Sequence, residues 1–421
     1  MNRNQLILLL VLVLVVGGLG LAVYKKNDAT WQAGANSSAG GKVLGDFALN
    51  DVARVVIKTG DSELALAKKN DTWVVAQRGD YPADFSQVGN LIQDLWQLKT
   101  VQEVKIGPSQ LSKLELVTPA KGAADTGTLV ELQGADSKPV ATLLLGKRFM
   151  KKMDQYPGEG GFAAGRYVMP VNGSNRVSLV SETLNQADPK PEQWLDKSFF
   201  RIDRIASVAI NSGTNQWKLS RENDSATDWK LADAKADEKV DSAKVPSFTS
   251  TLGSPAFNDV RPGVIDPQKP EPLDGSLTVQ TFDGFTYLLK LGKAEGDNLP
   301  LAVTVTADLP KERVAGKDEK PEDKKKLDDE FAAKNKALAE KLAKEKAFET
   351  RVYLVSKSGF DPLLKSRADL LVEKKPEPTP SPSPSPAPTP VASTPISVTT
   401  PPVSAPVVVP EKAPAKAPKK K

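Results

Sequence analysis

The side chains that this sequence lacks decide much of its possible chemistry. Among 421 residues there is no cysteine and no histidine. Within this chain that excludes a disulfide, a thiolate nucleophile, a zinc site or haem ligated by Cys or His, and a Ser-His-Asp triad. What remains is carboxylate, lysine, tyrosine or Ser-Lys chemistry, or no catalysis at all.

Three kinds of short motif come closest to a chemical site, and none has the spacing that its chemistry requires. GEGGFAAG at 158–165 lacks the GxxxxGK[ST] pattern of a phosphate-binding loop and precedes a predicted strand rather than a helix. Asp328-Asp329-Glu330 has no EF-hand spacing. Ser112-Lys113 and Ser356-Lys357 are adjacent in sequence, which is not catalytic geometry. We therefore predict no catalytic, cofactor-binding or metal-binding residue, and no cofactor.

The positive charge of the chain is confined to its end. Lys+Arg total 57 and Asp+Glu total 52, a net charge of +5. Residues 374–421 hold seven lysines and two acids, which also gives +5, so residues 1–373 sum to zero. A neutral body argues against a nucleic-acid surface, which needs a basic face. The basic tail is a weaker indication of an anionic partner.

An apolar run near the start predicts a membrane segment. Gln5 to Tyr24 contains 20 residues without a charge, which as a helix would span about 30 Å, the thickness of the hydrocarbon core. A cleaved signal peptide is the alternative, but its apolar core is shorter. We expect an uncleaved anchor with the body on the periplasmic side of the inner (cytoplasmic) membrane, although the flanking charges nearly cancel. Residues 27–46, rich in Gly, Ala, Ser and Asn, predict a flexible stalk.

The body consists of two tandem copies of one unit. At an offset of 153, Val55 aligns with Val208 and Ile57 with Ile210, and TLLLGK ending at Lys147 aligns with YLLKLGK ending at Lys293. Each copy alternates apolar and polar residues as half-buried strands do, and then shows the apolar spacing of one helix. The first helix is predicted to begin after an Asp84 N-cap, with Phe85, Val88, Leu91, Ile92, Leu95 and Trp96 on one apolar face. Further correspondences are predicted between Arg166–Val168 and Arg351–Tyr353, and between Trp73 and Trp229 as core residues.

The first copy also resembles a known family. Its segment TWVVAQRGDYPADFSQVGNLIQDLWQLKTV, which begins at Thr72, is similar to the bacterial family called domain of unknown function 4340. We expect the likeness to cover roughly residues 47–373, as two tandem copies. The resemblance implies an auxiliary component of a gliding-motility-type ABC transport system, with an ABC-2-type permease and its ATPase as partners. It implies no catalytic residues.

Two additions lie outside the repeat. A charged stretch at 310–346 consists of strong helix formers, with Leu327, Phe331, Leu338 and Leu342 in a narrow apolar stripe. It is either a solvated helix that rests this stripe on its own domain or a protruding arm that binds a partner. The tail 374–421, which contains PTPSPSPSPAPTP, is predicted to be disordered and polyproline-like.

Together these patterns predict an α+β fold. It comprises a single transmembrane helix (1–26), a stalk (27–46), repeat unit 1 (47–195), repeat unit 2 (196–373) and the tail, and each unit is a mostly antiparallel sheet with one packed helix. The leading hypothesis is a non-enzymatic, membrane-anchored extracytoplasmic accessory protein of an ABC-type complex. The alternative is an envelope structural protein that binds cell-wall polymer with the tail as spacer. A carboxylate-based glycan hydrolase ranks last, because no facing carboxylate pair stands out. Neither the transported substrate nor the oligomeric state follows from the sequence.

Overall fold

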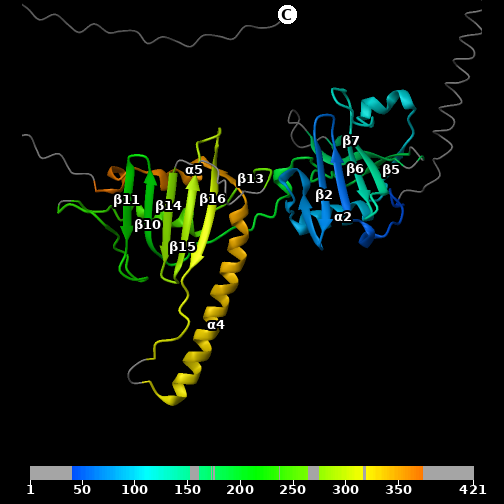
Figure 1. Cartoon of the computed structure of the whole chain (residues 1–421). Coiled ribbons are helices and arrows are strands. Elements are labelled where there is room, and N and C mark those ends of the chain that lie inside the picture. Colours follow the sequence, from blue (N-terminus) through cyan, green and yellow to red (C-terminus); the bar gives the residue numbers. More distant parts are fainter. Residues whose placement is uncertain are drawn as a thin grey trace, which may run out of the picture. The chain divides into compact units, whose positions relative to one another are not determined.

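The computed structural model describes residues 40–151, 161–171, 173, 176–236, 238–263, 275–315 and 319–372. These residues form two antiparallel sheets with a few helices, an α+β architecture (Figure 1). They all belong to one compact unit that ends at Val372. The predicted anchor (1–26), most of the predicted stalk and the predicted tail lie outside the described residues.

The first sheet has nine strands in the order β4-β3-β2-β1-β6-β7-β8-β9-β5. Each neighbouring pair is antiparallel. Its strands are β1 (Arg54–Lys58), β2 (Glu63–Lys69), β3 (Thr72–Val75), β4 (Tyr81–Pro82), β5 (Gln102–Val104), β6 (Thr128–Gln133), β7 (Pro139–Lys151), β8 (Phe162–Pro170) and β9 (Val177–Val180).

The second sheet has eight strands in the order β12-β11-β10-β14-β15-β16-β17-β13. They too pair only antiparallel. Its strands are β10 (Ile205–Ser212), β11 (Asn215–Ser220), β12 (Lys230–Leu231), β13 (Asp259–Val260), β14 (Gly275–Thr281), β15 (Phe285–Leu291), β16 (Asn298–Ala307) and β17 (Tyr353–Ser356).

Apart from β4, the two sheets repeat the same strand order, which agrees with the repeat in the sequence. The strand order also corrects one correspondence. The predicted match of Arg166–Val168 with Arg351–Tyr353 is wrong, because β8 takes the place in its sheet that β16 takes in the second. The sequence partner of β16 was hidden because the charged insertion separates β16 from β17, whereas only a short turn separates β8 from β9.

Helix α2 (Phe85–Gln97) covers one face of the first sheet. The Asp84 carboxylate accepts a hydrogen bond from the backbone N–H of Gln87 (3.0 Å), which confirms the predicted N-cap. Val88, Leu91 and Leu95 are buried among the strand side chains. Phe85, which was expected on the same face, is 70% exposed. Phe85 is the first residue of the helix, and burial of the apolar face begins only at Val88.

The predicted fold class is wrong in its helices. The second sheet has the one predicted packed helix, α3 (Val245–Gly253), and α4 (Pro321–Lys346), which lies within the charged stretch predicted at 310–346. It also has the short helix α5 (Lys357–Phe360), which was not predicted. The predicted single transmembrane helix is not found, since no helix of the described chain is long and apolar enough to cross a membrane. The longest of them, α4, is dense in lysine and carboxylate side chains, and such charges do not enter a hydrocarbon core unpaired.

Two glycines are required where β7 and β8 run close to neighbouring backbone. A Cβ on Gly146 would lie 2.3 Å from the carbonyl oxygen of Leu114, and one on Gly165 would lie 2.2 Å from that of Val180. Both distances are far inside van der Waals contact, and a backbone oxygen cannot rotate away as a side chain can. These positions therefore admit only glycine without a shift of the strands.

We expect Gly165→Ala to lower the free energy of unfolding by about 1–3 kcal/mol, the range for overpacking a filled site. Gly89→Ala in α2 is the matched control, because its added methyl group would meet nothing within 4 Å. Replacing a mid-helix glycine should raise stability by about 0.5–1 kcal/mol. Urea denaturation of both variants tests the pair. Equal effects of the same sign would contradict the close approach at Gly165.

Candidate functional site

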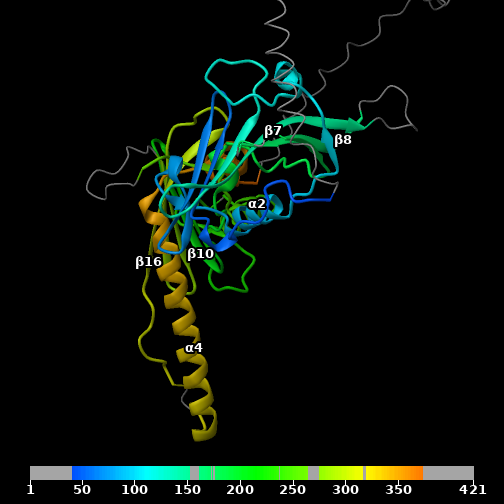
Figure 2. The ribbon, with the colours of Figure 1, turned by 90° about the vertical axis from the view of Figure 1, so that its right-hand side faces the viewer.

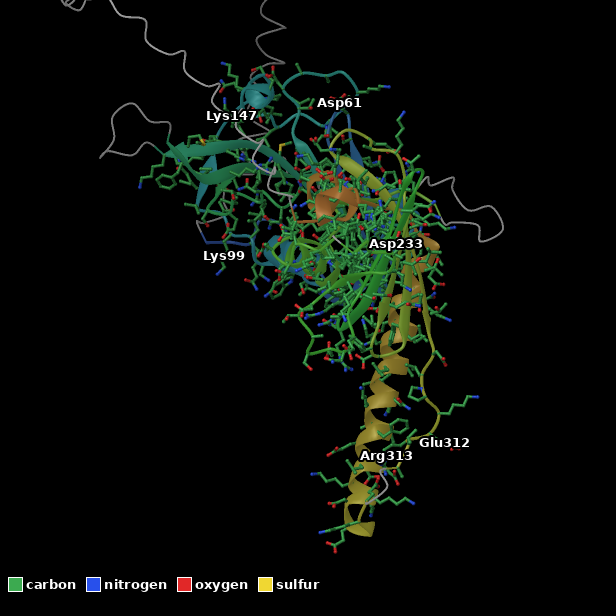
Figure 3. The ribbon with its side chains drawn as sticks, turned by 90° about the vertical axis from the view of Figure 1, so that its left-hand side faces the viewer. Asp61, Lys99, Lys147, Asp233, Glu312 and Arg313 are labelled. Atoms are coloured by element: carbon green, nitrogen blue, oxygen red, sulfur yellow. The ribbon has the colours of Figure 1, made fainter. Side chains whose placement is uncertain are left out.

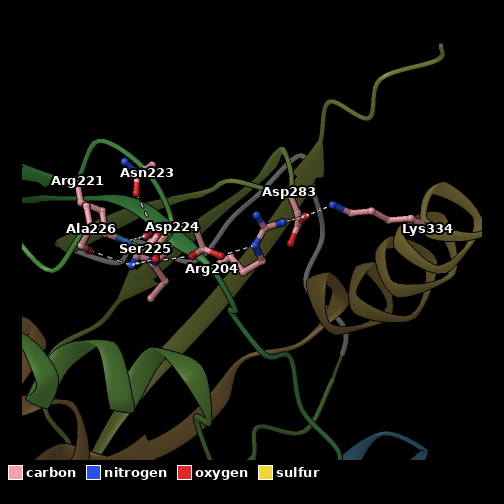
Figure 4. Close-up of polar contacts among 9 residues, drawn as sticks. Arg204, Arg221, Asn223, Asp224, Ser225, Ala226, Asp283 and Lys334 are labelled. Carbon is pink, nitrogen blue, oxygen red and sulfur yellow. Dashed lines mark hydrogen bonds and ion pairs between the residues drawn. The ribbon is translucent and has the colours of Figure 1, made fainter. Parts of the chain in front are cut away.

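A tight turn on the second sheet positions the first residue of the candidate site. Asp283-Gly284 connects β14 to β15, and Gly284 has the left-handed φ of +84° that such a turn needs. A Cβ there would lie 2.3 Å from the carbonyl oxygen of Asp308. The turn holds the Asp283 side chain at 15% exposure, between the Arg204 guanidinium and the Lys334 ammonium of α4, whose Nζ is 3.0 Å from Oδ1 (Figure 4).

From Asp283 a line of alternating charges continues across the ends of neighbouring strands of the second sheet. Arg204 bonds to Asp283 with one nitrogen, and its Nε donates to Asp224 Oδ2 at 2.7 Å. Arg221 donates to the other oxygen of Asp224 at 2.9 Å. The hydrogen bond from Arg204 lowers the pKa of Asp224 below its usual value. The charge line, which we define as Arg221, Asp224, Arg204, Asp283 and Lys334, thus joins β11, β10, the turn and α4 (Figure 4).

Arg204 holds its place in the charge line with an unusual backbone. Its φ of +50° is in the left-handed region, which costs a non-glycine residue roughly 1–3 kcal/mol. The conformation is fixed on both sides, because Ile202 and Ile205 are buried and the Arg204 carbonyl accepts the N–H of Phe282 at 2.9 Å. The strain accompanies a side chain that reaches two carboxylates at once.

A cavity of about 520 Å³ opens beside the charge line. It lies between the Ile202–Ile205 segment, the β11–β12 connection and α3, and its walls include Arg204, Arg221, Trp229 and Thr249. The Arg221 guanidinium lies 5.5 Å from the Trp229 ring centroid and 5.3 Å from that of Phe282, within cation–π range. A half-exposed aromatic ring beside hydroxyl and guanidinium groups is typical of a small-molecule site.

The cavity shows what the prediction for Trp229 missed. Trp73 is buried in the core as expected. Trp229 also packs against the core, with its ring centroid 6.1 Å from that of Phe248, but it precedes β12 and lines the cavity as well. The three-residue insertion before Trp229 was the signal in the sequence, because it shifts this tryptophan relative to its strand. Of the other tryptophans, Trp194 is buried and donates to the carbonyl of Asp188 (2.9 Å), whereas Trp96 is partly exposed beneath the Lys42 ammonium.

A buried carboxylate attaches helix α4 to the second sheet. The Glu345 side chain, only 7% exposed, accepts the Tyr287 hydroxyl at 2.7 Å and the backbone N–H of Arg201 at 3.0 Å, and it also pairs with Lys341. Burial and the hydrogen bond to Glu345 raise the pKa of Tyr287 far above its usual value, so this hydroxyl remains a donor. One turn further on, Glu349 accepts the N–H of Val305 in β16 (2.8 Å).

The predicted apolar stripe of α4 is buried near the root of the helix and exposed near its far end. Leu338 and Leu342, near the root, pack against the core. Leu327, near the far end, is 38% exposed. The segment before the helix runs back beside it, where Arg313 bonds to Asp328 at 2.8 Å and Asn335 donates to the carbonyl of Pro310 (Figures 2 and 3). We call this segment and α4 (308–346) the arm.

The motifs considered in the sequence do not converge on the cavity. Asp328-Asp329-Glu330 lies on exposed turns of α4. Ser356 contacts the hydroxyl of Ser358 at 3.0 Å, while Lys357 pairs with Asp361. The described part of GEGGFAAG leads into β8. Within the described ranges no group of three or more acidic side chains is arranged to hold a metal ion.

The root of the arm can be tested by removing one hydroxyl. We expect Tyr287→Phe to lower the free energy of unfolding by about 1.5–3 kcal/mol, because the buried Glu345 carboxylate loses the hydroxyl donor of Tyr287 and keeps only the Arg201 N–H and Lys341. Tyr167→Phe, in which a partly buried ring loses the same atom, is the control and should change stability by less than about 0.5 kcal/mol. If chemical denaturation gave equal losses for both, Glu345 would not depend on Tyr287.

The chain was compared with known proteins and protein families. No curated protein matches the chain. Residues 73–275 match the model of a family described as Domain of unknown function (DUF4340). The matched segment runs from β3 to the first residue of β14 and so crosses from the first sheet into the second, without α4. It is shorter than the expected 47–373, but it contains the segment on which the likeness was based. Over residues 73–275 the chain resembles the DUF4340 family.

Proposed function

We propose that this protein is a non-catalytic accessory subunit that binds a partner through its arm. The observation that carries the proposal is the division of α4 into a fixed root and an exposed outer part. The root is held by the buried Glu345 and by Leu338 and Leu342. From Glu322 to Glu330 the helix side chains are exposed.

The outer part of the arm has the composition of a docking element. A helix of 26 residues is about 39 Å long, which is far more than its root contacts need. The outer part of the arm bears two exposed apolar side chains among many charges: Val314, in the segment before α4, at 93% exposure and Leu327, on α4, at 38%. Apolar anchors ringed by charge are what a helix-in-groove contact uses, since the anchors supply affinity and the charges select the partner.

The identity of the partner rests on the family resemblance. We propose an ABC-2-type permease and its ATPase, as expected for a gliding-type auxiliary component, with this protein on the extracytoplasmic side of the inner membrane. The alternating charges from Lys334 to Arg221 connect the arm to the cavity in the second sheet.

The arm is tested by affinity purification of the full chain from native membranes in mild detergent. We expect the permease and ATPase to co-purify, and Val314→Asp with Leu327→Asp to reduce their yield by about tenfold, the effect of losing 1.4 kcal/mol. Phe85→Asp is the control, because this apolar residue is also exposed, at 70%, but lies on α2. Equal yields from all variants would reject the arm. Absence of the transporter from the wild-type preparation would reject the partner.

A second candidate function is favoured by the cavity. We propose as the alternative an envelope structural protein that binds cell-wall polymer. The exposed face of Trp229 can pack on the apolar face of a sugar ring, while Arg204, Arg221 and Thr249 offer hydrogen bonds to hydroxyl groups.

Sedimentation with purified cell wall distinguishes this alternative. If it holds, Trp229→Ala should reduce the sedimented fraction several-fold, because the cavity loses its aromatic wall. Trp96→Ala, which removes a partly exposed tryptophan on helix α2, should leave the fraction unchanged. No sedimentation of the wild type would reject the alternative without affecting the arm.

A further inference from the structure

Strands β7 and β8 continue past the first sheet as a two-stranded extension. The last residue of β7 that pairs with β6 is Leu145, opposite Thr128. Beyond it β7 pairs with β8 alone, from Arg148 opposite Arg166 to Lys151 opposite Phe162 (Figure 2). We call residues 147–151 and 162–166 the extension. The turn that connects them lies outside the described residues.

The second sheet has no counterpart of this extension. Its equivalent hairpin closes soon after Leu291 pairs with Leu301, where the Gly292 N–H bonds to the Pro300 carbonyl at 2.8 Å. The shared strand order is complete without the additional residues, so the extension is not needed to finish a sheet. It therefore requires an explanation other than the fold.

The extension exposes large apolar side chains. Phe149 is 36% exposed, Phe162 is 48% exposed and Met150 is 53% exposed. They are three of the ten large apolar side chains that are exposed in the described part of the chain, and Met150 and Phe162 lie beyond Arg166, the last residue of β8 that pairs with β9. An exposed apolar strand end is an aggregation hazard unless something covers it.

The extension is also positively charged. Lys147, Arg148 and Lys151 are exposed, and β7 and β8 contain no acidic residue. No described carboxylate forms an ion pair with any of the three. Arg148 lies directly opposite Arg166, an unfavourable cross-strand pair. Burial lowers the pKa of Arg166 to about 10, and the charge of Arg148 acts in the same direction.

We infer that the extension binds the surface of a bilayer that contains anionic phospholipid. Aromatic and thioether side chains enter the boundary between headgroups and acyl chains, while neighbouring Lys and Arg side chains reach back to phosphate groups. A lipid surface can accommodate the apolar side chains of both faces of the extension without a shaped groove. The basic side chains are complementary in charge to anionic phospholipid, which favours lipid over a protein partner. Figure 3 labels Lys147, where the extension begins.

A single fluorophore on the extension tests this, because the chain has no native cysteine. Met150→Cys is labelled with an environment-sensitive dye in the otherwise complete protein. The protein is then reconstituted with vesicles of brominated phosphatidylcholine, alone or mixed with phosphatidylglycerol. We expect lipid quenching several-fold stronger in the mixture. Val314→Cys, labelled in the same way on the arm, is the control and should remain unquenched.

Charge reversal makes the test specific. Lys147→Glu with Lys151→Glu should reduce quenching at position 150 by more than tenfold, since each basic residue near an anionic surface contributes roughly fivefold. Quenching that does not depend on phosphatidylglycerol, or that is equal at positions 150 and 314, would overturn the inference. So would a label that is shielded from aqueous iodide yet untouched by brominated lipid, which would indicate a protein on the extension. None of these readouts depends on a transporter.

Discussion

The burial of alternate side chains along β15 is the interaction on which the second sheet and its candidate site depend. Phe285, Tyr287, Leu289 and Leu291 all face the core, and the residues between them do not. Each buried large side chain contributes about 1.5–3 kcal/mol, so a slip of one residue would lose several such contributions at once. That register fixes the Asp283-Gly284 turn at one end of the charge line. It also aims the Tyr287 hydroxyl at Glu345. One strand therefore positions both the cavity edge and the root of the arm.

The two sheets show how one strand order supports different additions. In the first sheet the hairpin of β7 and β8 grows outward, and Gly146 and Gly165 allow it to leave between crowded backbones. In the second sheet the addition is a helix placed between β16 and β17. Neither addition disturbs the order of the eight common strands. This agrees with the general behaviour of antiparallel sheets, in which the connections between strands tolerate change because they lie at the surface, away from the buried core.

The sequence was most informative where one local signal acted alone. Asp84 caps α2 because its side chain reaches the Gln87 N–H, an interaction within three residues. The prediction for Phe85 failed because helical spacing does not show where a stripe first meets the sheet. The β8 and β17 correspondence failed because strand identity depends on hydrogen-bonding neighbours that are far apart in sequence. The charge line was not predictable, because Arg204, Asp224 and Asp283 meet only after three strands have paired.

The position of α4 also has a consequence for how the second sheet assembles. In the first sheet the chain passes from Pro170 at the end of β8 to Val177 at the start of β9, while in the second it passes from Ala307 to Tyr353 before β17 can join β16. The entropy of closing a flexible loop grows only with the logarithm of its length, so this roughly sevenfold longer excursion costs about 2 kcal/mol more. The hydrogen bonds that Glu345 accepts are of the same order. The hydrogen bonds to this buried carboxylate thus offset the entropic cost of the longer connection, so that the insertion of α4 need not weaken the pairing of β16 with β17.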